Sequence, residues 1–520
     1  MSKYLMAIDA GTGSLRSVIF DVEGNQISVS QQEWTHNEDP RYPNSMDFDV
    51  DKNYQIMMNC VKESIKTSKI NPKDIIAISS TSMREGIVLY DSSGKEIWAC
   101  ANVDARADEE VKQLKALSDD IEKDIYEESG QTFALGALPR ILWVKNHMPE
   151  VYEKVASVTM LNDWITYKLT GILSVEPSNG CTTGMFNLSS RKWDNQIAKK
   201  CGLKEDIYPD VYECGKPIGK ILREMAEEFG LSEECLIVAG GGDANLGCVG
   251  VGVCSSGQAA LFGGSFWQLE YNVDTPEVDE DCRLRVNCHI LENTWQYEMI
   301  AFFPGLVMRW FRDAFCETEK ELAKKKNISA YTLLEEQAAK VPVGSHGILC
   351  SFSSVMDYKE WKHASPAFVN FGIDPEKYTK GAFYRALMEN AALVTLGHSK
   401  IISETTGKKI DEVIFASGAS QSDLWCQIVS DVLGAKVKVP KVKEATALGT
   451  SICAGVGAGL YASIEDAAKQ LVQFEKEYTP NMENHKKYLE IYDTWKEINK
   501  TQMFNSDRGL ISHMWKAPGL

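Results

Sequence analysis

The sequence predicts an α/β protein built from two similar domains. A strand, a tight glycine turn and a second strand are expected over Tyr4–Phe20, and the same order returns over Gln258–Leu269. Because these hairpins begin about half a chain apart, we expect a duplicated fold with a ligand cleft between the halves. At 520 residues the chain is too long for one ordinary core, so we expect domains at 1–250 and 251–520.

The composition is that of an ordinary globular protein, with 44% hydrophobic and 25% charged residues. The formal net charge of −18 argues against a nucleic-acid or anionic-membrane partner, because either would need a clustered basic face. A nucleotide ligand is compatible with this charge, since backbone amides and a metal ion can bind its phosphates.

The cysteines and the apolar segments indicate a cytoplasmic protein. Fourteen cysteines occur without a Cys-x-x-Cys pair, which predicts buried free thiols in a reducing compartment. The first acidic residue, Asp9, comes too early for a signal peptide. The longest uncharged run, Ala445–Ile464, is rich in Gly, Ala, Ser and Thr, which favours a buried helix over a membrane span.

The first glycine turn is a candidate phosphate site. Its backbone amides and the hydroxyls of Thr12 and Ser14 can hold phosphate oxygens, while Asp9 can hold a magnesium ion through water. A plain hairpin turn is the alternative interpretation.

Polar clusters follow three apolar strands, where ligands of open α/β sheets commonly bind. Arg84 and Glu85 follow the strand Asp74–Ser80 and offer donors and acceptors to a polyhydroxylated substrate, or form only a surface ion pair. Asp104 follows the strand Ile97–Val103. Asp163 follows the apolar Met160 and Leu161, and a cap of the next helix is the alternative interpretation.

The segment Ile237–Gly247 places one carboxylate, Asp243, on a run of three glycines behind a buried strand. Glycines let the backbone approach a ligand closely. The alternative is a glycine-rich turn that caps a helix. Further along, Ala416–Asp423 is a small-residue turn before a helix, which suits a purine face or an anion. Ser178–Gly184 is expected to be a loop, the polar segment after it to be helical as far as Gly230, and the tail from Lys469 to be a peripheral helical appendage.

Together these features point towards phosphoryl transfer. The Walker motif and the Gly-x-Gly-x-x-Gly fingerprint are absent, so the phosphates must be held in another way. An actin-like ATPase without a small-molecule acceptor is an alternative of a different class.

Seven clusters in the same order resemble the carbohydrate kinases that include glycerol, xylulose and gluconate kinases. They are Asp9–Arg16, Arg84–Glu85, Asp104–Arg106, Gly242–Asp243, Gly263–Ser265, Gly418–Ala419 and Glu444–Gly449. The resemblance implies two actin-like (ribonuclease H-like) domains, each a mixed five-stranded sheet flanked by helices, which close on ATP, Mg²⁺ and a sugar. It also implies, by family analogy alone, a phosphocarrier protein of the sugar phosphotransferase system as a partner.

The resemblance assigns roles to individual residues. Asp243 is implied to be the catalytic base, with its ordinary acidity sufficient for the task, and to hold the metal together with Asp9. The residues implied to bind substrate are Arg84, Glu85, Asn102, Asp104 and Asp163. Those implied to bind ATP are Gly11, Thr12, Gly13, Ser14, Arg16, Gly264, Ser265, Gly418, Ala419 and Ser422.

Within this family the chain is most similar to the kinases of the quorum-sensing signal autoinducer-2, 4,5-dihydroxypentane-2,3-dione. The segments that carry this likeness are Ser82–Tyr90, Trp98–Arg106, Met308–Cys316 and Trp515–Leu520. It implies transfer from ATP to the C5 primary hydroxyl. Asn102 and Ala244 stand where glycerol kinases have Trp and Gln, which disfavours glycerol and fits an acceptor with carbonyls. A kinase for another small sugar or polyol such as xylulose is the alternative.

Overall fold

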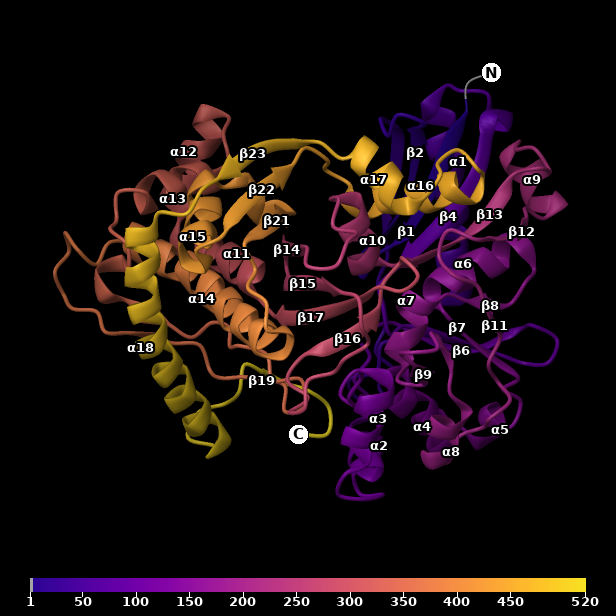
Figure 1. Ribbon diagram of the computed structural model, residues 1–520, viewed down its shortest axis with the longest axis horizontal. Helices are drawn as coiled ribbons and strands as arrows, with labels where there is room; N and C mark the ends of the chain where they lie inside the picture. Colours follow the sequence, from indigo (N-terminus) through magenta and orange to yellow (C-terminus); the bar gives the residue numbers. More distant parts are fainter. Residues whose placement is uncertain (1–2) are drawn as a thin grey trace.

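The structure is a computed structural model that describes residues 3–520. It consists of two α/β lobes, one drawn in indigo to magenta and the other in pink to yellow (Figure 1). We call them the first and second lobe, after the order of their sheets in the chain. The predicted two-domain α/β architecture is confirmed.

The first lobe is organised around a six-stranded mixed sheet with the order β12-β13-β4-β1-β2-β3. Its strands are β1 (Tyr4–Ala10), β2 (Ser14–Asp21), β3 (Gln26–Glu33), β4 (Ile75–Ser82), β12 (Pro217–Lys220) and β13 (Leu236–Gly242). β1 runs parallel to β4 and antiparallel to β2, so the first predicted hairpin is present. Leu5, Met6, Ala7 and Ile8 are all fully buried, because helices cover both faces of this sheet.

The helices of the first lobe are α1 (Val50–Ser68), α2 (Asp108–Lys115), α3 (Ile121–Ser129), α4 (Ala137–His147), α5 (Pro149–Tyr152), α6 (Leu161–Thr170), α7 (Pro177–Gly180), α8 (Asn195–Lys200), α9 (Arg223–Phe229) and α10 (Asp243–Gly250). A small sheet β6-β5-β7 is formed by β5 (Ile87–Tyr90), β6 (Glu96–Cys100) and β7 (Ser157–Met160). Two further sheets of two strands each belong to this lobe. They are formed by β8 (Ser174–Val175) with β11 (Asp210–Val211) and by β9 (Phe186–Asn187) with β10 (Lys192–Trp193).

The second lobe has a seven-stranded sheet with the order β16-β17-β15-β14-β21-β22-β23. Its strands are β14 (Ala259–Gly263), β15 (Trp267–Val273), β16 (Arg285–Cys288), β17 (Trp295–Ala301), β21 (Glu412–Ala416), β22 (Lys436–Pro440) and β23 (Phe474–Tyr478). The remaining elements are α11 (Pro304–Phe315), α12 (Glu317–Lys326), α13 (Ala330–Ala338), α14 (Lys380–Thr406), α15 (Asp423–Leu433), α18 (Met482–Asp507), β18 (Leu349–Cys350), β19 (Lys362–His363), β20 (Phe368–Val369) and β24 (Trp515–Lys516).

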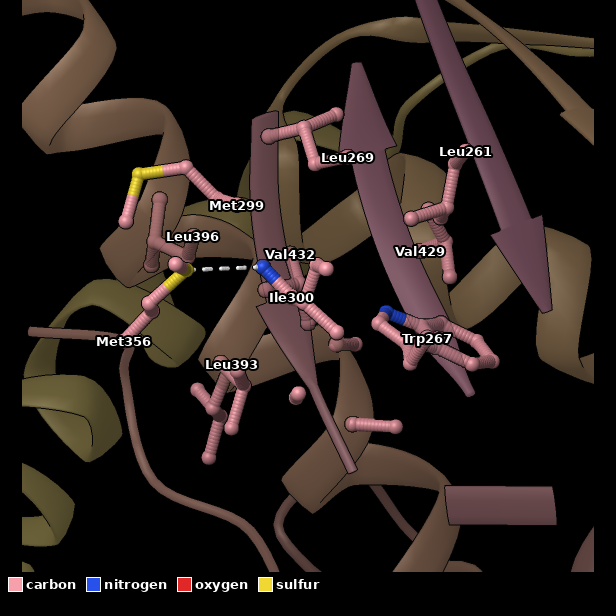
Figure 2. Packing of buried hydrophobic residues seen from close by; sticks show 14 of the residues in the cluster. Leu261, Trp267, Leu269, Met299, Ile300, Met356, Leu393, Leu396, Val429 and Val432 are labelled. Carbon is pink, nitrogen blue, oxygen red and sulfur yellow. Dashed lines mark hydrogen bonds between the residues drawn. The ribbon is translucent and has the colours of Figure 1, made fainter. Parts of the chain in front are cut away.

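The core of the second lobe lies between this sheet and the helices α14 and α15. Trp267 and Leu269 of β15 belong to one buried cluster with Leu393 of α14 and Val429 of α15, and Figure 2 shows these four side chains. The amide of Ile300 donates to the sulfur of Met356 at 3.1 Å, as the dashed line in Figure 2 marks. Dense apolar packing of this kind makes β15 and β17 a rigid support for the residues at their ends.

Two expectations about the size and the end of the fold were wrong. The sheets have six and seven strands, not five each, because β12, β16 and β23 extend their edges. The tail contains the expected helix, α18, but it is not an appendage, since β23 pairs with β22 and α18 buries Tyr488 and Trp495. These aromatic residues are spaced for one helix face but are diluted by charged neighbours, which hid the pattern.

The segment between α6 and β13 also differs from the prediction. Ser178–Gly184 is not a loop, because α7 and a 3₁₀ turn, Cys181–Thr183, occupy it, and the buried carboxylate of Glu176 accepts the amides that open α7. The polar segment that follows, expected to be helical, instead contains β9, β10, β11 and β12 with two short helices.

One helix of the second half of the chain returns to the first lobe. α16 (Ala445–Gly457) packs on the β1–β4–β13 face, and with α17 (Ile464–Leu471) it lies against the first lobe in Figure 1. The predicted buried helix is therefore present, but it stops at Gly457. A Cβ atom at Gly449 would lie 2.0 Å from the carbonyl oxygen of Leu246, so α16 and α10 cross with their backbones in close contact. Of the helices in residues 3–520, none has the length and apolarity to cross a bilayer.

Candidate active site

Asp243 begins α10, directly after the carboxyl end of β13. The preceding glycines allow β13 to lie close to β4: a Cβ atom at Gly240 would be 1.8 Å from the carbonyl oxygen of Ser80, and one at Gly242 would be 2.9 Å from Cδ of Arg84. This proximity brings Oδ1 of Asp243 to 3.7 Å from Nε of Arg84. The N-cap position of α10 is Gly242, not Asp243, so the helix-capping interpretation is not what the structure shows.

The acidity of Asp243 is tuned by its surroundings. Burial raises the pKa of Asp243 to about 6, the charge of Arg84 and the amide of Ala244 oppose this shift, and Glu85 and Glu298 add to it. The expectation of an ordinary Asp was therefore wrong, because the sequence could not show how far Asp243 is withdrawn from water or that Glu298 of the second lobe lies near it. At pH 7 the carboxylate is still mostly ionised, and it is a better proton acceptor than a free Asp.

Asp9 lies at the end of β1 and is 6% exposed. Burial raises the pKa of Asp9 to about 7, Arg16 lowers it, and Asp243 and Glu444 raise it. The Nη1 atom of Arg16 lies 3.7 Å from Oδ2 of Asp9 and 3.0 Å from Oε2 of Glu444. Asp9 and Asp243 are thus close enough to repel each other.

A cation would relieve this repulsion. Within residues 3–520, no three His, Cys, Asp or Glu side chains are grouped so that they could enclose a metal ion. Mg²⁺ is commonly held by one or two carboxylates together with water and phosphate oxygens. Asp9 and Asp243 fit such a shared site, and they do not fit one made of protein ligands alone.

The turn between β1 and β2 has its carbonyl groups occupied from one side. The indole Nε1 of Trp34 donates to the carbonyl oxygen of Gly11 at 3.0 Å, and the ring Nε2 of His36 lies 3.0 Å from that of Thr12. The amide of Trp34 donates to the oxygen of Gly13 at 3.2 Å. With its carbonyls engaged in this way, the turn can present N–H groups to an anion. Ser14 is the first residue of β2 and accepts a hydrogen bond from Gln31.

The second glycine turn meets the small-residue turn before α15. A Cβ atom at Gly263 would lie 2.6 Å from that of Ala419, and one at Gly305 would lie 2.1 Å from the carbonyl oxygen of Gly264. Gly264, Ser265, Gly418 and Ala419 are therefore gathered where β14, α11 and α15 begin or end. The hydroxyl of Ser422 accepts the amide of Trp425 at 3.1 Å and so caps α15.

The helix α10, which Asp243 begins, has contacts that lead to both turns. A Cβ atom at Gly247 of α10 would be 3.2 Å from the ring of Phe262, the residue before Gly263, and 3.4 Å from the hydroxyl of Thr446. Thr446 of α16 also donates to the carbonyl oxygen of Asp243 at 3.3 Å, and the nearby Glu444 binds Arg16. α10 and the start of α16 thus join the two turns.

Arg84 and Glu85 are buried, with 5% and 8% exposure, so the surface ion-pair interpretation is wrong. Arg84 forms an ion pair with Glu298, and Glu85 forms one with Arg285. Both partners belong to the second lobe. Glu85 has a φ of 62°, a left-handed conformation that costs energy in a residue with a side chain and is common at functional sites.

The other predicted substrate residues have well-defined contacts. Asn102 donates to the hydroxyl of Thr12 at 3.1 Å and so joins the polar cluster to the first turn. The buried carboxylate of Asp104 accepts from Arg106 at 2.8 Å and from the amide of Met46 at 2.6 Å. Asp163 lies in the first turn of α6, where it accepts the amide of Met160 at 3.3 Å, as the capping alternative predicted. A substrate contact of Asp163 stays a prediction.

Arg140 of α4 was missed from the sequence. It is 2% exposed, and its guanidinium donates to the carbonyl oxygens of Asn102 at 2.7 Å, of Asp104 at 2.8 Å and of Glu85. One buried cation therefore holds the backbone of two of the predicted substrate segments, that of Glu85 and the turn Asn102–Asp104. The signal was an arginine inside the apolar stretch 137–144, where a charge is costly unless it has partners.

The comparison with known families decides the identity of this arrangement. Residues 4–250 match the N-terminal domain of the FGGY family of carbohydrate kinases, and residues 275–458 match its C-terminal domain. The chain belongs to the FGGY family of carbohydrate kinases.

Several FGGY kinases resemble this one over its whole length. It is 47% identical to the autoinducer-2 kinase of Enterobacter sp. (strain 638), over 99% of this chain and 98% of that protein. It is also 47% identical to the autoinducer-2 kinase of Photorhabdus laumondii, over 100% and 98% of the two chains. Among solved FGGY folds, gluconate kinase from Lactobacillus acidophilus superposes with a TM-score of 0.85 at 20% identity, over 96% of this chain and 98% of that one. Glycerol kinase from Plasmodium falciparum with ADP gives 0.82 at 20% identity, over 96% and 98%.

Proposed function

We propose that this FGGY kinase transfers the γ-phosphoryl group of ATP to the C5 primary hydroxyl of autoinducer-2, 4,5-dihydroxypentane-2,3-dione, to give phospho-autoinducer-2. The observation that carries the proposal is the identity of 46–47% to proteins named autoinducer-2 kinase over nearly the full length of both chains. The proximity of Asp243 to Arg84 and Asp9 also supports the proposal, because these residues are suited to phosphoryl transfer.

In the reaction, the C5 oxygen forms a bond to the γ-phosphorus while the bond from that phosphorus to the β,γ-bridging oxygen breaks and ADP leaves. Asp243 accepts the proton of the hydroxyl, for which its raised pKa of about 6 suits it. Arg84, 3.7 Å away, orients the acceptor and keeps the carboxylate in its ionised form. A bound Mg²⁺, held by Asp9 and Asp243 with phosphate oxygens, would supply charge neutralisation at the transferred group.

The remaining predicted residues are proposed to bind ATP. Thr12, Gly13 and Ser14 of the first turn would hold the β- and γ-phosphates, with Gly11 and Arg16 beside them. Gly264 and Ser265 would bind from the second lobe, and Gly418, Ala419 and Ser422 would line the adenosine site. Closure of the lobes around both ligands would exclude water from the γ-phosphorus. This would prevent transfer of the phosphoryl group to water in place of the acceptor.

The proposal also covers the cellular compartment and a partner protein. All fourteen cysteines are buried and free, which suits a reducing cytoplasm. By family analogy, a phosphocarrier protein of the sugar phosphotransferase system is proposed as a regulatory partner.

The test is a product analysis with purified protein, Mg-ATP and separate acceptors: the dione, xylulose, gluconate and glycerol. We expect ADP to form fastest with the dione and the phosphate to be found on C5. Faster turnover of xylulose would favour the alternative sugar kinase. ADP formation at the same rate without any acceptor would instead favour an actin-like ATPase.

A further inference from the structure

Five charged side chains form an alternating chain that runs from Asp243 into the second lobe. Asp243 contacts Arg84, Arg84 pairs with Glu298, Glu298 with Arg285, and Arg285 with Glu85. Arg285 and Glu298 stand opposite each other on β16 and β17, whereas the other three belong to the first lobe. The second lobe therefore supplies the charged partners of Arg84 and Glu85, two of the predicted substrate residues.

The side chain of Arg285 is buried and held by several contacts. It is 2% exposed, its Nε donates to Gln131 at 2.6 Å, and its Nη1 lies 3.3 Å from Oε1 of Glu298. Tyr358 lies under the guanidinium at 5.9 Å and donates its own hydroxyl to Gln131 at 3.2 Å. These contacts fix the plane of the guanidinium, because the Arg side chain otherwise has many rotamers.

One nitrogen of this fixed group is left over. Among residues 3–520, Nη2 of Arg285 has no hydrogen-bond partner, although it is fully buried. An unsatisfied buried donor is costly, and cationic donors are the most costly of all. Such a donor next to substrate residues is expected to have a ligand oxygen as its partner.

The position along the charge chain indicates which oxygen this is. Asp243 marks the place where the reacting hydroxyl must lie, and Arg285 is separated from it by Arg84 and Glu298. A guanidinium only donates hydrogen bonds, so it suits a carbonyl oxygen, which only accepts them. In the dione, the carbonyl groups are at the end of the carbon chain away from C5.

We propose that Arg285 is an acceptor-binding residue supplied by the second lobe, and that its Nη2 binds a carbonyl oxygen of the acceptor. This role rests on the proposed function, since it places a carbonyl-bearing acceptor with its primary hydroxyl at Asp243. Arg285 thereby selects carbonyl compounds over polyols of the same length.

The experiment compares two acceptors in three variants. The acceptors are the dione and the tetrol obtained when both of its carbonyls are reduced to hydroxyls. The variants are Arg285→Lys, which keeps the charge for Glu85 and Glu298 but has only one donor nitrogen, Arg285→Met, and the control Arg283→Met. Arg283 lies two residues earlier and binds Asp279 and Glu404 near the surface.

We expect both Arg285 variants to lower kcat/KM for the dione roughly 10- to 100-fold, through KM, with at least tenfold less effect on the tetrol. KM for ATP should stay unchanged, and Arg283→Met should behave as wild type. Melting curves check folding, and Arg285→Lys supplies the answer if Arg285→Met does not fold. Equal losses for both acceptors, or no loss in Arg285→Lys, would overturn the role of Arg285 alone. A wild-type protein inactive on the dione would overturn the proposed function itself.

Discussion

At the scale of single residues, the carboxylates of the active site raise one another's pKa values. Asp243 and Asp9 both have raised pKa values, to about 6 and about 7, because Asp243 is partly and Asp9 almost fully withdrawn from water and each has acidic neighbours. Arg84 and Arg16 oppose these shifts without cancelling them. The sequence singled out Asp9, Arg84, Glu85 and Asp243, which the structure brings close together, and their roles stay predictions. It could not reveal Arg285 or Glu298, because they come from strands about 200 residues later in the chain.

The pKa of Asp243 predicts how activity depends on pH. A base must be deprotonated to act, and the folded-state pKa is above that of a free Asp, so activity is lost as pH falls through about 6. We expect kcat/KM for the acceptor to be constant above about pH 7 and to fall about tenfold per unit well below pH 6. The measurement is a pH–rate profile at saturating Mg-ATP. A profile that stays flat down to pH 5 would show that Asp243 is not tuned as described.

At the scale of elements, the hairpins and α15 follow from local sequence. Glycine turns and uninterrupted apolar strands define β1–β2 and β14–β15, and α15 begins at Asp423, directly after the small-residue turn. Prediction failed where tertiary contacts decide: β23 is a charged, mostly exposed strand that forms by pairing with β22, and α18 packs against α15. The role of Arg140 was missed for the same reason, since its three carbonyl partners come from two segments that precede α4 in the chain.

The contacts of Arg140 predict a specific defect. Arg140→Met leaves the carbonyl oxygens of Glu85, Asn102 and Asp104 without their donor, so these segments should lose their alignment. We expect KM for the acceptor to rise roughly 10- to 100-fold while KM for ATP changes less than about threefold. Lys145→Met, on the same helix but near the surface, is the matched control. Equal increases in both KM values would point to general unfolding of the lobe.

At the scale of the whole molecule, the two lobes are joined by more than the chain between them. α16 belongs to the second half of the sequence but packs on the sheet of the first lobe. It also crosses α10, which carries Asp243. The crossing depends on glycine, since Cβ atoms at Gly449 and Gly250 would lie 2.0 and 1.8 Å from backbone oxygens. The sequence predicted a buried small-residue helix here, and its place against the other lobe came only from the structure.

Substitution at this crossing should therefore affect stability and catalysis together. Gly449→Val would force α16 away from α10 and move Glu444 from Arg16, with a loss of about 1–3 kcal/mol in the free energy of unfolding. We expect a lower Tm and a lower kcat, measured by calorimetry and steady-state kinetics. Val456→Ala, on the same helix, should cost stability with little change in kcat. An unchanged Tm in Gly449→Val would contradict the close crossing.

The central claim is that Asp243, at the start of α10, takes the proton of the acceptor hydroxyl. Its most direct test is single-turnover phosphorylation of the dione by Asp243→Ala, with ATP affinity measured in the same preparation. The account predicts a rate lower by roughly 10²- to 10⁴-fold with ATP still bound. Phosphoryl transfer at close to the wild-type rate would contradict it.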